Sequence, residues 1–348
     1  IHMNLIKNFL RFTLFLFITI VLIEITSAIL LKIDFFEKRN HTFLTKEYTE
    51  IINDNELNLK KNFFTNKNKD WEVFTDKNRL RVEEENFNHD LFSNNEKIVF
   101  IGDSVPFGFG VNYKDSIPGS FSEYNLNLTS INAAVPSYTF KQSVDKYIKE
   151  FKSIKKIKYI YLSNFNPLDL YLMFGAKWNE DINWSNHVSY LSEDLFFFKY
   201  KKIPLWGDIN FFSILRKIYI VYFFKSKNYF DNSRNYETDL KFSNYINNQL
   251  NRLYKNIDLD TKLILSPTIS PLYFVEEDDL NKVDKERLKV LNLINYEIKN
   301  FKKKNVIYLD LHKVFHSFES KDLFIDNCCH LTPFASSKIA EKLSSIVN

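Results

Sequence analysis

The chain has 348 residues, of which 45% are hydrophobic and 26% are charged, and its formal net charge is +4. These values are ordinary for a globular protein that buries a core, and the length allows more than one structural unit. The charge is small and there is no arginine-rich arm, so we expect no binding to nucleic acid. The two cysteines, Cys328 and Cys329, are adjacent, which excludes a disulfide framework and a CxxC motif. We interpret them as small apolar loop residues.

An apolar segment near the N-terminus covers residues 12–31 and contains one charged residue, Glu24. About twenty such residues match the hydrocarbon core of a bilayer. We therefore expect residues 4–32 to form a transmembrane anchor, with a cleaved signal peptide or a buried core helix as the alternatives. Basic residues flank both ends, so the positive-inside rule sets no orientation. Single N-terminal anchors commonly precede exported domains, which favours an extracytoplasmic location, in the periplasm or at the cell surface.

The remaining chain divides into a polar segment and a regular one. Residues 33–96 are polar and irregular, and we interpret them as a stalk with an N-terminal extension. From residue 97 onward, apolar runs alternate with amphipathic patterns, which predicts an α/β domain over 97–348 with a parallel sheet. Ligands of such sheets bind beyond the carboxyl ends of the strands. The expected strands are 97–101, 130–135, 157–162, 262–265 and 305–309, and the expected helices are 138–151, 240–256, 279–302 and 333–346.

Residues 175–235 interrupt this alternation and are rich in aromatic side chains. Aromatic runs are usually buried, so we interpret this segment as a helical insertion packed on the core. The alternative is a lid or a membrane-contacting patch that shapes a substrate pocket.

Four of the six glycines lie between Gly102 and Gly119, directly after the first expected strand. Glycine allows a sharp turn and a close approach of ligand to the backbone, and Ser104 would project here from the strand end. The segment lacks the Lys-Ser or Lys-Thr pair of a Walker A loop and the third glycine of G-x-G-x-x-G. It is not the elbow G-x-S-x-G either, because Pro106 stands where the second glycine would be.

The stretch that begins Phe100-Ile-Gly-Asp-Ser104 and continues to Pro118 resembles the first block of the SGNH/GDSL hydrolases. The segment Asp326-Asn-Cys-Cys-His330, followed by Leu-Thr-Pro, is similar to the last block of that family. The resemblance covers about residues 97–346. It implies a three-layer, flavodoxin-like fold with a five-stranded parallel sheet. It also implies that Ser104 is the nucleophile and that His330 is its general base.

Two further blocks imply the donors of an oxyanion hole, to which the main-chain N–H of Ser104 would also contribute. Asn132-Ala-Ala-Val-Pro-Ser137 is similar to the second block, where the family usually has glycine in place of Ser137. Serine can supply the same N–H if the backbone needs no positive φ. Leu162-Ser-Asn-Phe-Asn166 follows the third expected strand and is similar to the third block, which implies the side-chain amide of Asn166 as a donor.

The acid of the triad departs from the family pattern. The family has aspartate three residues before the histidine, whereas Asp326 lies four residues before His330 and Asn327 occupies the usual place. Either a one-residue bulge lets Asp326 orient the imidazole, or the site is a Ser–His dyad.

The resemblance implies acyl transfer to Ser104 and then to water, without a cofactor or a metal. The leading interpretation is a serine esterase that removes acyl groups, acetyl foremost, from a cell-envelope polysaccharide or glycolipid. The membrane helix would hold the enzyme beside that acylated glycan or lipid. The alternatives are an O-acyltransferase of the same fold and a non-catalytic envelope-assembly protein with a degraded site.

Overall fold

The computed structural model describes residues 2–32, 48–52, 56–65, 71–163, 171, 175–181, 234–326 and 328–348. The chain forms two compact units, and the second comprises residues 45–187 and 230–348. Most of the aromatic segment 175–235, and with it the expectation of a packed insertion or a lid, lies outside the described residues.

The first unit contains helix α1 (His2–Lys32). Within it, Arg11–Ile29 has a mean hydropathy of 2.3 and is long enough to cross a membrane. Large apolar side chains such as Phe12 and Phe15 are 64% and 69% exposed, which does not fit a helix buried in a protein core. The helix is consistent with a membrane anchor or a signal sequence.

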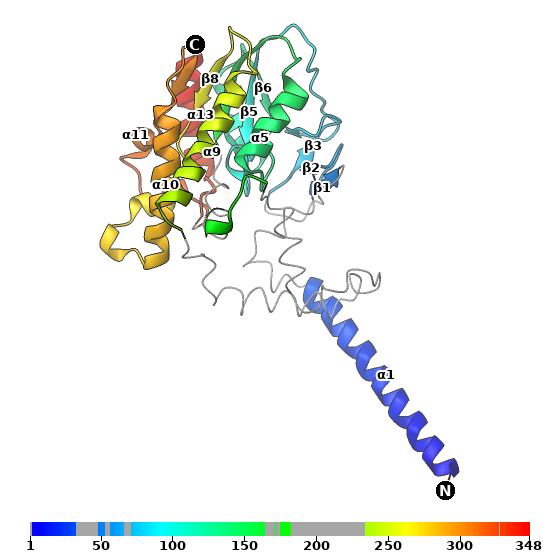
Figure 1. Ribbon diagram of the computed structural model, residues 1–348. Helices are drawn as coiled ribbons and strands as arrows, with labels where there is room; N and C mark the ends of the chain where they lie inside the picture. The colour runs from blue at the N-terminus through cyan, green and yellow to red at the C-terminus, as the bar shows by residue number, and fades with distance from the viewer. Residues whose placement is uncertain are drawn as a thin grey trace. The chain divides into compact units, whose positions relative to one another are not determined.

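The second unit is built on a seven-stranded sheet of order β3-β4-β6-β5-β7-β8-β9 (Figure 1). Its five strands from β6 to β9 are parallel, and in chain order they read 2-1-3-4-5, the flavodoxin-like arrangement. The five-stranded parallel sheet predicted from the sequence is thereby confirmed. The strands are β3 (Phe74–Thr75), β4 (Arg81–Val82), β5 (Lys97–Gly102), β6 (Thr129–Asn132), β7 (Ile157–Ser163), β8 (Lys262–Leu265) and β9 (Val306–Tyr308).

Helices cover the sheet in two groups. Connections between parallel strands are right-handed, so the direction in which a connection runs along the sheet decides which face its helix covers. The connection from β5 to β6 runs one way, and the later connections from β6 through β9 run the other way, so their helices cover opposite faces. Accordingly α4 packs against α13, while α9 packs against both α5 and α10, which makes three layers (Figure 1). The helices of this unit are α3 (Ser104–Phe107), α4 (Ile117–Tyr124), α5 (Phe140–Lys146), α9 (Tyr236–Tyr254), α10 (Lys282–Asn300), α11 (Leu311–Phe315), α12 (Ser320–Leu323) and α13 (Pro333–Val347).

The central parallel strands are buried on both faces, because the helices that connect them cover the sheet. All six residues of β5 are buried, as expected for continuous apolar strands between two helix layers. Helix α13 begins where Thr332 caps it by accepting a hydrogen bond from the N–H of Ala335, with Pro333 in the first turn. The expected helix 138–151 is instead α5 followed by a π-helical turn, Tyr147–Phe151.

Part of the segment before residue 97 is built into the second unit. Strands β1 (Thr49–Ile52) and β2 (Glu56–Leu59) form an antiparallel hairpin, and β2 contacts α5 through Lys146, whose Nζ donates to Asn58 at 2.8 Å. Strand β4 pairs with β6 and continues the sheet beyond its parallel part. This extension carries Arg81 toward the loop that follows β5.

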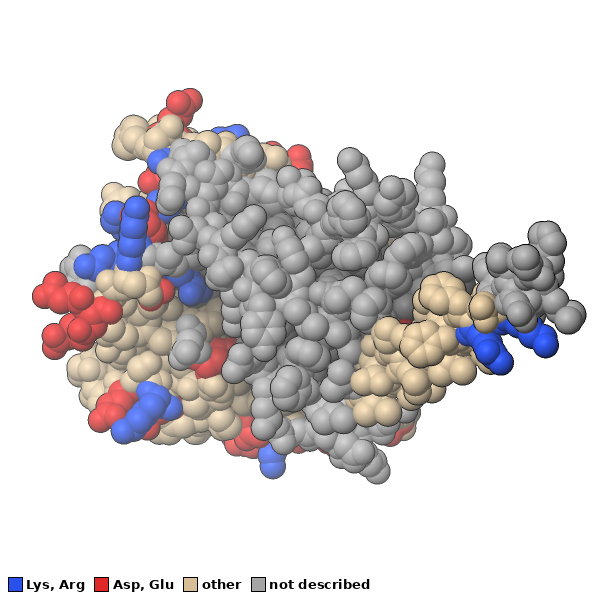
Figure 2. All heavy atoms as spheres, turned by 90° about the horizontal axis from the view of Figure 1, so that it is seen from below, with Lys and Arg blue, Asp and Glu red and all other residues tan. Residues whose placement is uncertain are grey.

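The face shown in Figure 2 carries acidic and basic side chains next to one another on its described part. No patch of one sign dominates there. The expectation that the chain does not bind nucleic acid stays a prediction.

Candidate active site

Ser104 lies where the central strand β5 gives way to helix α3. Asp103 caps this helix by accepting a hydrogen bond from the N–H of Val105 at 3.0 Å. The preceding Gly102 has a φ of 144°, and a Cβ there would lie 1.8 Å from the main-chain oxygen of Ser163. Only glycine fits that turn, which explains its place in the motif. Ser104 is partly exposed at the carboxyl end of the sheet.

His330, which lies near the C-terminus, contacts the side chain of Ser104. Its Nε2 lies 2.9 Å from Oγ of Ser104, a hydrogen-bond distance. The side chain of His330 is 10% exposed, and the ring of Phe109 packs against the imidazole with the centroids 4.5 Å apart. The two predicted residues, which are far apart in sequence, are therefore brought together by the fold.

Asp326 contacts the second ring nitrogen of His330, Nδ1. Its other carboxylate oxygen accepts hydrogen bonds from the N–H groups of Cys328, Cys329 and His330 at 3.0, 3.2 and 3.3 Å. The N–H of Ile325 also donates to the main-chain oxygen of His330 at 2.9 Å, which closes the loop. These hydrogen bonds hold a carboxylate oxygen of Asp326 at Nδ1 of His330, which is the contact that the bulge alternative requires.

The charge state of Asp326 defines the tautomer of His330. Burial alone would raise the pKa of Asp326, but hydrogen bonds from His330 and from the N–H of Cys328 lower it to about 2. The carboxylate is then ionised at neutral pH and can only accept, so Nδ1 of His330 carries the proton. Nε2 is left free to accept the proton of the Ser104 hydroxyl.

Ser137 lies in the loop after β6, the strand beside β5. Its N–H had been expected as an oxyanion donor provided that the backbone needs no positive φ, but its φ is 70°. The cause is a turn in which the N–H of Tyr138 donates to the oxygen of Val135 at 3.1 Å. With Pro136 and Ser137 at its centre this is a type II turn, which favours glycine at the second position. Asn166, the other expected donor, lies outside the described residues.

Arg81 is a residue of the site that the sequence analysis missed. Its Nη1 donates to the main-chain oxygens of Phe107 and Gly108, both at 2.6 Å, and its Nη2 donates to that of Val111 at 2.6 Å. The side chain is fully buried, and burial lowers its pKa to about 10, so it stays charged at neutral pH. It fixes the loop that carries Phe109 against His330.

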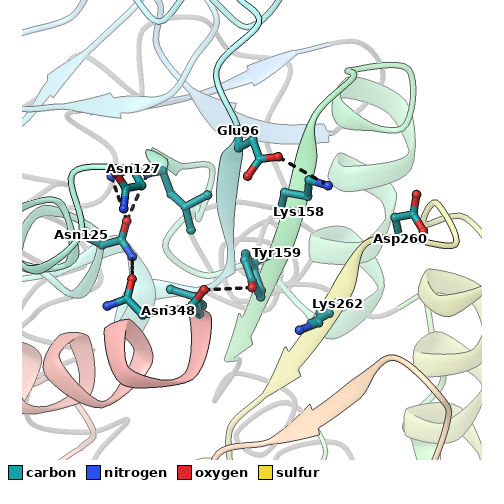
Figure 3. A pocket seen from close by; sticks show the side chains of 10 residues that line it. Glu96, Asn125, Asn127, Lys158, Tyr159, Asp260, Lys262 and Asn348 are labelled. Atoms are coloured by element: carbon teal, nitrogen blue, oxygen red, sulfur yellow. Dashed lines mark hydrogen bonds and ion pairs between the residues drawn. The ribbon is translucent and has the colours of Figure 1, made fainter.

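Other described features do not add to this site. A pocket of about 570 Å³ lies at the amino ends of the strands, opposite to Ser104, with Lys158 and Lys262 among its lining residues (Figure 3). Lys158 is paired there with Glu96 at 3.5 Å. Among the described residues no three His, Cys, Asp or Glu side chains are arranged to hold a metal ion. The metal-free and cofactor-free reaction stays a prediction.

No protein-family model matches the chain, and no curated protein matches it. Solved structures do. A member of the lipolytic protein G-D-S-L family from Veillonella parvula is 12% identical, covering 72% of this chain and 97% of its own, with a TM-score of 0.38. The lipase Lip_vut3 from a goat rumen metagenome is 13% identical, with coverages of 72% and 96% and a TM-score of 0.43. The acetylxylan esterase Axe2 from Geobacillus stearothermophilus is 12% identical, with coverages of 74% and 94% and a TM-score of 0.38.

Structures of the G-D-S-L family are thus among the matches, and this is the family that the sequence resembles. These likenesses concern the fold alone.

Proposed function

We propose that this chain is a serine hydrolase of the SGNH/GDSL type that cleaves carboxylic esters. Ser104 is the nucleophile, His330 is the general base, and Asp326 orients the imidazole. The observation that supports this most strongly is the continuous contact from Ser104 Oγ to His330 Nε2, at 2.9 Å, and from His330 Nδ1 to Asp326. Serine is a weak nucleophile unless such a base lies beside it.

The reaction follows from these three side chains. Oγ of Ser104 attacks the ester carbonyl while its proton passes to Nε2 of His330. The ionised carboxylate of Asp326 stabilises the imidazolium that forms. Collapse of the tetrahedral intermediate breaks the ester C–O bond, and His330 protonates the departing alcohol. Water then attacks the acyl-Ser104 ester with His330 again as base, which releases the acid and restores the serine.

The oxyanion would be held by main-chain and amide donors. The N–H of Ser104 is in the first turn of α3, where a helix offers no internal acceptor. Ser137 adopts, with strain, the positive φ that a glycine would take at this position, and its main-chain N–H is kept. We therefore propose the N–H of Ser137 and the side-chain amide of Asn166 as the other donors. Losing one such donor raises the barrier by about 3 kcal/mol.

We further propose that the substrate is an acylated, foremost acetylated, polysaccharide or glycolipid of the cell envelope. The support is the apolar segment Arg11–Ile29, which as an anchor would hold the hydrolase beside such polymers outside the cytoplasm. Acetate released from an acetylated envelope glycan, without transfer to an added sugar, is the expected result. An acyl group that appears on the added sugar would identify a transferase instead.

The test of the serine chemistry is labelling with a fluorophosphonate, followed by mass spectrometry of the adduct. We expect one adduct, on Ser104, which is absent in Ser104→Ala and slowed at least a hundredfold in His330→Ala. Ser122→Ala serves as the matched control, because Ser122 is a partly buried serine on α4 whose hydroxyl donates to the oxygen of Pro118. A folded protein without an adduct on Ser104 would overturn the proposal.

A further inference from the structure

The two cysteines of the chain lie in contact directly before His330. Their sulfur atoms are 2.8 Å apart, and neither cysteine is in a disulfide. The side chain of Cys329 is buried, whereas Cys328 is partly exposed. The first cysteine is therefore the more accessible of the two, and the sulfur of the second already lies beside its own.

Both cysteines belong to the loop that holds the carboxylate of the site. Their N–H groups donate to Oδ1 of Asp326 at 3.0 and 3.2 Å. The main-chain oxygen of Cys328 accepts a hydrogen bond from Ser270 Oγ at 3.2 Å. A change in the main chain of the pair would therefore reach Asp326 and His330 directly.

A disulfide between neighbours cannot form on the main chain as it stands. Ordinary disulfides join Cα atoms about 4.4–6.8 Å apart, whereas adjacent Cα atoms across a trans peptide are about 3.8 Å apart. Closing the sulfur–sulfur bond requires the peptide between Cys328 and Cys329 to rotate. That rotation would turn the N–H of Cys329 away from Asp326 and displace the backbone of His330.

We propose that Cys328 and Cys329 form a reversible disulfide that switches the site off, an inference that rests on the proposed function. The Cys328 thiolate attacks a low-molecular-weight disulfide and releases one thiol. The Cys329 sulfur then loses its proton and displaces the second thiol, so that the pair is oxidised by two electrons and the small disulfide is reduced to two thiols. Burial raises the pKa of Cys329 well above its usual value, so Cys328 is the thiol that reacts first. Disulfides with unfavourable geometry are easily reduced, which makes the step reversible.

The experiment uses the full chain in detergent, incubated with dithiothreitol or with oxidised glutathione, and then denatured in urea so that the buried thiol is accessible, alkylated and analysed by mass spectrometry. The chain has no other cysteine, so alkylation reports on this pair alone. We expect two alkyl groups on the reduced protein and none on the oxidised protein. We expect fluorophosphonate labelling of Ser104 to be at least tenfold slower after oxidation and to recover with dithiothreitol. Cys328→Ser should label at the reduced rate under both conditions, and Cys329→Ala, which introduces no polar group into the buried position, should do the same.

The possible failures are distinguishable. Two alkyl groups after oxidation, or a disulfide-bonded protein that labels as fast as the reduced one, would overturn the switch alone. A reduced, folded protein that does not label Ser104 would overturn the proposed hydrolase and the switch with it.

Discussion

The carboxylate of Asp326 contacts Nδ1 of His330, four positions further along the chain. The loop between them is closed by three N–H groups that donate to the same carboxylate. The acid is therefore part of the loop structure as well as of the proposed triad.

Replacing Asp326 with asparagine removes the charge that stabilises the imidazolium and permits the wrong tautomer of His330. We expect kcat for a chromogenic acetyl ester to fall by about 10⁴-fold, the effect of losing the carboxylate in a serine triad. Asp322→Asn, at an exposed carboxylate on α12, should leave kcat unchanged. An active Asp326→Asn variant would show that Ser104 and His330 work as a dyad.

The stability of the fold should depend on pH through the same carboxylate. The pKa of Asp326 is lowered from 3.8 to about 2, so the folded state binds this proton less readily than the unfolded state. The carboxylate therefore stabilises the fold fully above about pH 4, and this contribution is lost as the pH falls toward 2. Urea unfolding of the wild type and of Asp326→Asn at several pH values measures it. The stability difference should be constant above pH 5 and shrink below pH 4, and a constant difference over the whole range would contradict the lowered pKa.

The guanidinium of Arg81 should control turnover through the loop 107–111. Arg81→Met removes the hydrogen bonds to four main-chain oxygens, those of Phe107, Gly108, Val111 and Glu72. A buried acceptor left without any donor costs about 1–3 kcal/mol, so we expect severe destabilisation. Arg81→Lys keeps the charge but loses the planar fork, and we expect kcat at least tenfold lower with KM nearly unchanged.

The matched control for Arg81 is Lys146→Met, which removes another buried cation, one that binds Asn58 and Glu150 away from Ser104. It should lower the melting temperature and leave kcat unaltered. A folded Arg81→Lys protein with the wild-type kcat would show that Arg81 serves stability alone.

Ser137 offers a prediction about strain. A residue other than glycine in the left-handed region costs about 1–2 kcal/mol, and the greater freedom of glycine in the unfolded chain offsets part of the relief. We therefore expect Ser137→Gly to raise stability by up to about 1 kcal/mol, measured by urea unfolding, with kcat retained because the N–H remains. A tenfold fall in kcat would indicate that the hydroxyl of Ser137, and not its N–H, serves the reaction.

Much of the fold could be read from the sequence because its signals are local. Continuous apolar runs mark the parallel strands, and the glycine before Ser104 and the Thr-Pro pair after His330 mark the turn and the helix start. Pro136 is also a local signal, because proline favours the second position of a type II turn.

Other parts depend on contacts that leave no local pattern. Three of the four acceptors of Arg81 are main-chain oxygens 26 to 30 residues away, which any sequence could supply. The distance from the Asp326 carboxylate to the His330 ring is determined by the hydrogen bonds within their loop and not by the number of residues between them. The sulfur contact likewise arises from how that loop folds.

The pairing of β4 with β6 has a consequence for how this protein can be handled. Without β4, strand β6 would be the outer strand of the parallel sheet, and its unpaired main-chain groups would invite pairing with another molecule. A truncated chain starting at residue 97 would keep every residue of the family resemblance but would expose β6 as an unpaired edge strand. Aggregation of such a fragment during expression would therefore result from the loss of strand β4 and not from a defect in residues 97–348.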